Sequence, residues 1–129
     1  MKECNNNFYN TIIKNTTYEV VGKNILIQSI DFENEPINYI IKTENFNNYC
    51  KKIIEYAFIN GEIELEEIQE LLFKDIFKVY KTKVATKRIS LLLLYYLTIK
   101  DIFFSADGIK YIVIKEYDHV FENFKNIFV

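Results

Sequence analysis

The residues with the greatest potential for catalysis are few and far apart in this chain. The only histidine, His119, stands beside Asp118 near the start of a predicted last helix, and no serine or cysteine motif accompanies it. General acid–base and nucleophilic catalysis need such partners within hydrogen-bond reach. We therefore predict that the protein is not an enzyme and that His119 is a surface or capping residue.

The metal-ligating residue types are equally scattered. One histidine and two distant cysteines, Cys4 and Cys50, do not make a zinc site. Three glycines in the whole chain exclude a phosphate-cradling loop or a dinucleotide fingerprint. Asp31, Glu33 and Glu35 could attract a hard cation, but they precede a proline in a predicted turn and are better explained as a solvated loop. We predict no metal and no cofactor.

The charge pattern is more informative than any catalytic motif. The stretch from Lys74 to Lys100 holds seven of the 16 basic residues and one of the 18 acidic residues, so its formal charge is +6 in a chain of net charge −2. Basic residues cluster before an apolar run, and we predict them to be the partner-binding residues: Lys78, Lys81, Lys83, Lys87 and Arg88. An opposed acidic group precedes them: Glu62, Glu64, Glu66, Glu67 and Glu70. The alternative is that both groups are the solvated ends of one helix, where such charges complement the helix dipole.

Residues 17–42 have the composition and turn signals of a three-stranded β-meander. Tyr18 to Val21, Ile25 to Phe32 and Ile37 to Ile41 are the predicted strands. The first pair is separated by Gly22-Lys-Asn, which accepts positive φ. Pro36 breaks the second pair, because proline lacks the donor for a strand ladder.

Three helices should follow. Thr43 can cap a helix from Glu44 to Ile59, which carries an apolar stripe that includes Tyr49, Cys50 and Phe58, and Asn60-Gly61 ends it. The second helix, at about 62–82, has a broad apolar stripe that widens over Phe73 and Phe77 and so predicts burial against more than one neighbour.

The third predicted helix, at about 84–98, is apolar on all sides from Ile89 to Leu97. This pattern is typical of a central core helix. The run is about half the roughly 20 residues needed to cross a bilayer. We therefore expect no membrane-spanning segment, and with no targeting signal visible and two unpaired cysteines we expect a cytoplasmic protein.

A β-hairpin at about 102–114 is indicated by Asp107-Gly108 between two apolar runs. A last amphipathic helix is predicted from Tyr117 to Phe128. The expected fold class is α+β: an N-terminal meander, three central helices, the hairpin and a C-terminal helix. We expect residues 1–129 to form a single globular domain with residues 1–10 frayed.

The order of helix 62–82, helix 84–98 and hairpin 102–114 resembles the second half of a DNA-binding winged helix. The resemblance implies that Thr86 to Thr98 is the recognition helix, with Lys83, Lys87 and Arg88 placed to reach phosphates. It implies polar side chains on the groove face, however, and this helix offers only Ser90 and two tyrosines.

Protein binding is the function that we favour from the sequence. A small domain without catalytic motifs, with charged patches and a surplus of Tyr and Phe, is typical of an inhibitor or neutraliser of another protein, such as a toxin-immunity protein or a phage inhibitor. Nucleic-acid binding is the alternative, and a homodimer is compatible with either interpretation.

Overall fold

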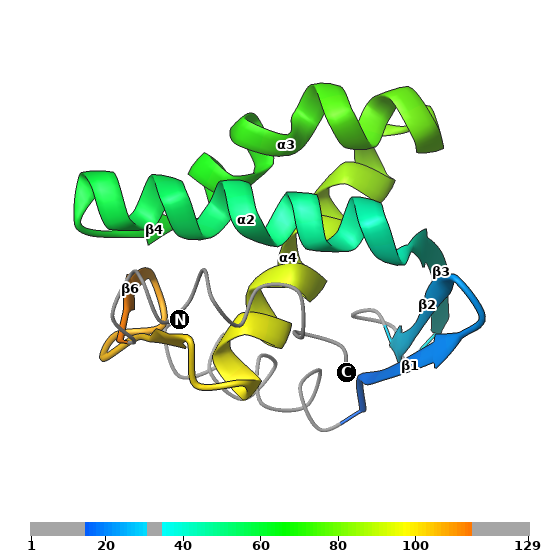
Figure 1. Ribbon diagram of the computed structural model, residues 1–129, viewed down its shortest axis with the longest axis horizontal. Coiled ribbons are helices and arrows are strands. Elements are labelled where there is room, and N and C mark those ends of the chain that lie inside the picture. Colours follow the sequence, from blue (N-terminus) through cyan, green and yellow to red (C-terminus); the bar gives the residue numbers. More distant parts are fainter. Residues whose placement is uncertain (1–14, 31–34, 115–129) are drawn as a thin grey trace. The chain divides into compact units, whose positions relative to one another are not determined.

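The computed structural model describes residues 15–30 and 35–114. Their contacts divide the chain into two compact units, 1–46 and 47–129, which we describe separately. The described residues are α+β: two three-stranded sheets and three helices (Figure 1). The predicted C-terminal helix, Tyr117 to Phe128, lies outside the described residues, as does His119.

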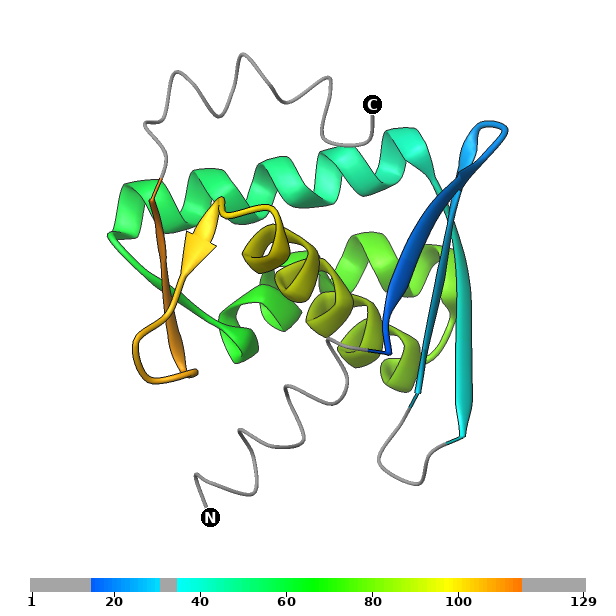
Figure 2. The same ribbon diagram turned by 90° about the horizontal axis from the view of Figure 1, so that it is seen from below.

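The first unit contains the predicted meander. Strands β1 (Thr17–Val21), β2 (Asn24–Ile30) and β3 (Pro36–Lys42) pair antiparallel in the order β1-β2-β3 (Figure 2). Ile25, Ile27 and Ser29 are buried at alternate positions of β2, as the period of a half-buried strand requires. Pro36 begins β3 instead of lying in a break before it, which strand geometry permits at a first residue.

Helix α2 (Thr43–Asn60) begins in the last residues of the first unit and continues into the second. It buries most of its predicted stripe, including Tyr49 and Cys50. Two details of the prediction are wrong. Phe58 is 51% exposed. Thr43 is the first helical residue, and its buried hydroxyl has no hydrogen-bond partner, so it does not cap the helix. Gly61 ends the helix at φ 85°, the left-handed conformation expected of it.

The second unit contains a strand that the sequence analysis missed. Ile63 and Glu64 form β4, which pairs antiparallel with β6 (Lys110–Val113), and β6 also pairs with β5 (Phe103–Phe104). The sheet order is therefore β4-β6-β5, and the Asp-Gly hairpin is its β5–β6 half (Figure 2). Helix α3 consequently starts at Leu65, three residues later than predicted.

Helices α3 (Leu65–Tyr80) and α4 (Lys83–Ile99) pack against each other and are joined by Lys81 and Thr82. Lys81 closes α3 in the left-handed conformation, and its N–H donates to the carbonyl of Phe77 at 2.8 Å. Thr82 is the N-cap of α4, where its Oγ1 accepts from the N–H of Ala85 at 3.1 Å. This tight connection brings the end of one helix beside the start of the next.

Helix α4 is the core element that its apolar run predicted. Every residue from Ile89 to Leu97 except Leu91 is buried. None of the helices in the described part of the chain has both the length and the apolar character needed to cross a membrane.

Candidate functional site

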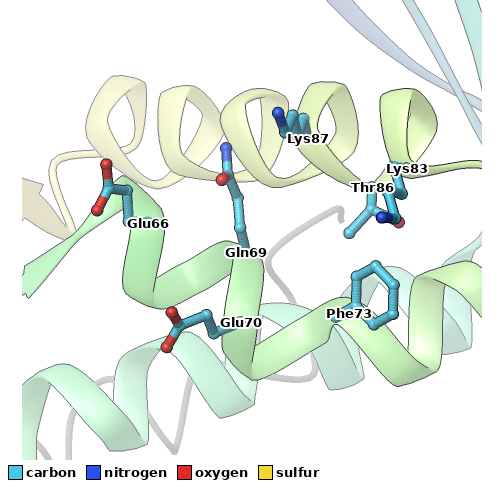
Figure 3. A pocket seen from close by; sticks show the side chains of 7 residues that line it. All are labelled: Glu66, Gln69, Glu70, Phe73, Lys83, Thr86 and Lys87. Carbon is cyan, nitrogen blue, oxygen red and sulfur yellow. The ribbon is translucent and has the colours of Figure 1, made fainter.

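A hollow of about 550 Å³ lies between α3 and the first half of α4 (Figure 3). It lies wholly within the second unit. Its lining comes from both helices: Glu66, Gln69, Glu70 and Phe73 from α3, and Lys83, Thr86 and Lys87 from α4. In the close-up view Phe73 and Thr86 point toward each other across the gap, and Lys83 lies next to Thr86.

The two walls carry opposite charges. Glu66 and Glu70 are exposed on α3, and Lys83 and Lys87 are exposed on α4. Among the residues that the structure describes, none of these four groups takes part in a salt bridge. Their charges therefore remain available to a partner that enters the hollow.

The acidic group predicted from the sequence splits into two kinds of residue. Glu67 stabilises the fold: one carboxylate oxygen accepts from the N–H of Glu64 at 3.0 Å and the other from the hydroxyl of Tyr56 at 2.5 Å. That hydrogen bond raises the pKa of Tyr56. Glu62 pairs with Lys110 at 3.5 Å. Glu66 and Glu70, by contrast, face the hollow.

The basic group is also divided. Lys83 and Lys87 line the hollow, whereas Lys78 and Lys81 are exposed at the end of α3 outside it, and Arg88 is half-buried. All five lie in the last turn of α3, the connection or the first two turns of α4. The structure thus brings two of the five predicted partner-binding residues together with two carboxylates.

Exposed aromatic rings are the feature of this surface that the sequence analysis misjudged. Phe73 and Phe77 are each 37% exposed and stack with ring centroids 5.3 Å apart, instead of widening the buried stripe. Ile68, Leu72 and Ile76 alone form the buried face of α3. The buried residues form an i, i+4, i+8 series, and Phe73 and Phe77 lie outside it as a separate pair four residues apart. This spacing is the only sequence signal that could have predicted their exposure.

A second set of interactions fixes α3 from its other side. Lys52 of α2 forms an ion pair with Asp75 of α3. Asp75 also contributes, after burial, to raising the pKa of Tyr49. These contacts hold α3 without using the residues that line the hollow.

Two of the residues considered for metal binding or nucleophilic chemistry, Cys50 and Glu35, are among the described residues. No group of three or more His, Cys, Asp or Glu side chains in the described ranges is placed to hold a metal ion. Cys50 is fully buried, which raises the pKa of its thiol far above the ordinary value and keeps it protonated. Of the carboxylate cluster in the predicted turn, only Glu35 is among the described residues, and it is exposed.

No protein-family model, curated protein or solved structure matches this chain.

Proposed function

We propose that the second unit is a protein-binding module that engages its partner at the hollow between α3 and α4. The observation that carries this proposal is the presence of both charge signs around an exposed aromatic ring. Protein surfaces display both signs, so each wall of the hollow can find a complement on them. A polyphosphate would be attracted by Lys83 and Lys87 but repelled by Glu66 and Glu70.

The composition of the hollow also suits a protein interface. Binding energy at such interfaces is concentrated in a few central side chains, often aromatic, surrounded by a polar rim that excludes water. Phe73 and Phe77 would be the anchors, and the four charged residues the rim. The biological role that we propose is the one favoured by the sequence, an inhibitor or neutraliser of another protein, acting by occupation of the partner's surface without catalysis.

Nucleic-acid binding is the second candidate, and one observation favours it. Strand β4 joins the same sheet as the hairpin, which is consistent with the resemblance of α3, α4 and the hairpin to a winged helix. The exposed start of α4 carries Lys83 and Lys87, which could contact phosphates. Ser90 and both tyrosines of α4 are buried, however, so the side chains expected to read bases are not accessible.

Two double variants test these functions, and the glutamate pair separates them because its expected effects on the two kinds of partner have opposite signs. Lys83→Gln with Lys87→Gln should weaken binding to either kind of partner. Glu66→Gln with Glu70→Gln should lower the affinity for a protein partner by about three- to tenfold, since exposed charge pairs contribute up to about 1 kcal/mol each. The same glutamate variant should strengthen binding to a nucleic acid, because it removes repulsion.

The measurements are capture of host-lysate proteins on the immobilised chain and anisotropy of a random DNA duplex at low salt. The matched control is Lys23→Glu with Lys42→Glu, two exposed lysines of the first unit. Protein binding is supported if the wild-type chain captures one dominant protein, both glutamine double variants lose it and the control variant retains it. Duplex binding that falls steeply with salt and rises in the glutamate variant would replace the proposal with the second candidate.

A further inference from the structure

The charges of the hollow are separated along its length as well as across it. Glu66 and Glu70 belong to the first half of α3. Lys83 and Lys87 belong to the first two turns of α4, which begins beside the end of α3 because only two residues join the helices. Glu66 and Lys83 accordingly lie toward opposite ends of the hollow (Figure 3). The hollow therefore has an acidic end and a basic end.

Gln69 lies between these two ends. It is half-buried, and its side chain projects from α3 toward α4 (Figure 3). Within the described part of the chain its side-chain amide makes no hydrogen bond. Such an amide carries two N–H donors and a carbonyl acceptor, so it can pair with a C=O and an N–H of a bound backbone. A helix has already paired those groups with each other, so Gln69 suits an extended chain better than a helix.

The spacing of the lining residues also matches an extended chain. Glu66 and Phe73 are seven residues apart on α3, a rise of about 10 Å, which about three extended residues cover. Successive side chains of an extended chain point to opposite sides. The carboxylates line the α3 wall and the lysines the α4 wall. A basic and an acidic side chain three positions apart would therefore each face their complement, and the residue two positions from the basic one would face Phe73.

We infer that the hollow binds an extended segment of the partner protein in which a basic residue, any residue, an apolar residue and an acidic residue follow one another, in either chain direction. The basic side chain meets the carboxylates of α3, and the acidic one meets the lysines of α4. The apolar side chain contacts Phe73, and the Gln69 amide pairs with the backbone. The inference rests on the proposed function, because it names the kind of segment that the partner inserts into the same hollow.

Selection of phage-displayed random peptides on the immobilised full chain tests the inference. Peptides of about 12 residues can present opposite charges either three residues apart or at the two-turn helical spacing of about seven. We expect enrichment of the spacing of three, with an apolar residue between the charges and next to the acidic one. Enrichment of the helical spacing, or of neither, overturns the inference. Lysate capture with the glutamine variants still tests the proposed function separately in both cases.

An enriched peptide, synthesised with both ends capped, then locates the contact by fluorescence anisotropy. Gln69→Leu keeps the size of the side chain and should lower the affinity about fivefold, through loss of hydrogen bonds to the backbone. An unchanged affinity in this variant would overturn the extended arrangement. The matched control, Lys23→Gln with Lys42→Gln in the first unit, should leave the affinity unchanged.

A charge reversal with rescue completes the test. Glu66→Lys with Glu70→Lys should lower the affinity at least about tenfold, because two favourable charge pairs become repulsive. The same peptide with glutamate in place of its basic residue should bind this variant more tightly than it binds the wild type. Rescue of this kind cannot come from a misfolded variant, and circular dichroism checks helix content. Loss without rescue, or no loss, overturns the inference because the peptide then does not use the acidic end.

Discussion

Helices α3 and α4 have nearly the same length, 16 and 17 residues, and are separated by two residues, yet they bury very different surfaces. Helix α3 buries three side chains and exposes phenylalanines and charges on its opposite face. Helix α4 buries ten and exposes mainly its first turns. The difference shows that α4, the more apolar of these two helices, forms part of the core, while α3 supplies most of the candidate binding surface.

Truncation of a buried leucine should give the largest effect. Leu93 of α4 is fully buried, so Leu93→Ala should lower the free energy of unfolding by about 2–5 kcal/mol through lost burial and a cavity. Val79 of α3 is 51% exposed, and Val79→Ala should change the free energy of unfolding by no more than about 0.5 kcal/mol. Urea denaturation followed by circular dichroism measures both. Equal losses would mean that the two helices contribute alike to the core.

Alkaline pH should lower the free energy of unfolding through two buried tyrosines of α4. Burial raises the pKa values of Tyr95 and Tyr96 well above their ordinary value of 10.0. The unfolded chain then releases protons above pH 10 that the folded chain retains, so stability is full below that pH and falls as pH rises. Each tyrosine should contribute a slope of about 1.4 kcal/mol per pH unit.

The variant Tyr96→Phe isolates one of these contributions. Its free energy of unfolding, measured by urea denaturation at several pH values above 10, should fall less steeply than that of the wild type. Burial also raises the pKa of the Cys50 thiol, but this thiol is present in both proteins and so does not contribute to the difference between their slopes. An unchanged slope in the variant would show that Tyr96 ionises as readily in the folded state as in the unfolded state.

The smallest effect concerns the boundary between the two helices. Thr82→Ala removes the cap of α4 and should lower the free energy of unfolding by about 1 kcal/mol. Thr98→Ala is the matched control, because that hydroxyl donates to the carbonyl of Leu94, which the helix already positions. We expect the control to change stability by only a few tenths of a kcal/mol. Thermal unfolding of both variants is sufficient, and similar shifts would argue against a capping role.

Local patterns predicted much of this architecture. The alternation in β2, the stripe of α2 apart from Phe58 and the Asp-Gly hairpin each depend on residues close together in the chain, and all three were confirmed. Strand β4 was missed because two residues carry no periodicity, and Glu64 together with the glutamates on either side of it resembles a helix start. It is defined by its partner in β6, which no local pattern reveals.

The candidate site was predictable only in part, for a related reason. The lysines at the start of α4 and the glutamates of α3 are visible in the sequence as charged groups. Their position on facing walls depends on the packing of α3 against α4. Period alone also does not say how wide a stripe is buried, so Phe73 and Phe77 were assigned to the core although only the narrower series Ile68, Leu72 and Ile76 of α3 is buried. Gln69 and Thr86 carry no signal of their own.

The pairing of β4 with β6 has a consequence for how the chain folds during synthesis. Helices α3 and α4 can form from contiguous sequence as soon as residue 99 is available, but Ile63 pairs with Tyr111. The backbone groups of Ile63 stay unpaired until the end of the hairpin has been synthesised. Bringing Ile63 and Tyr111 together closes a long loop, which has an entropic cost before the strand pairing stabilises the chain. A nascent chain therefore holds the helical pair with an unpaired strand β4, which gains its partner only when Lys110 and Tyr111 of β6 are available.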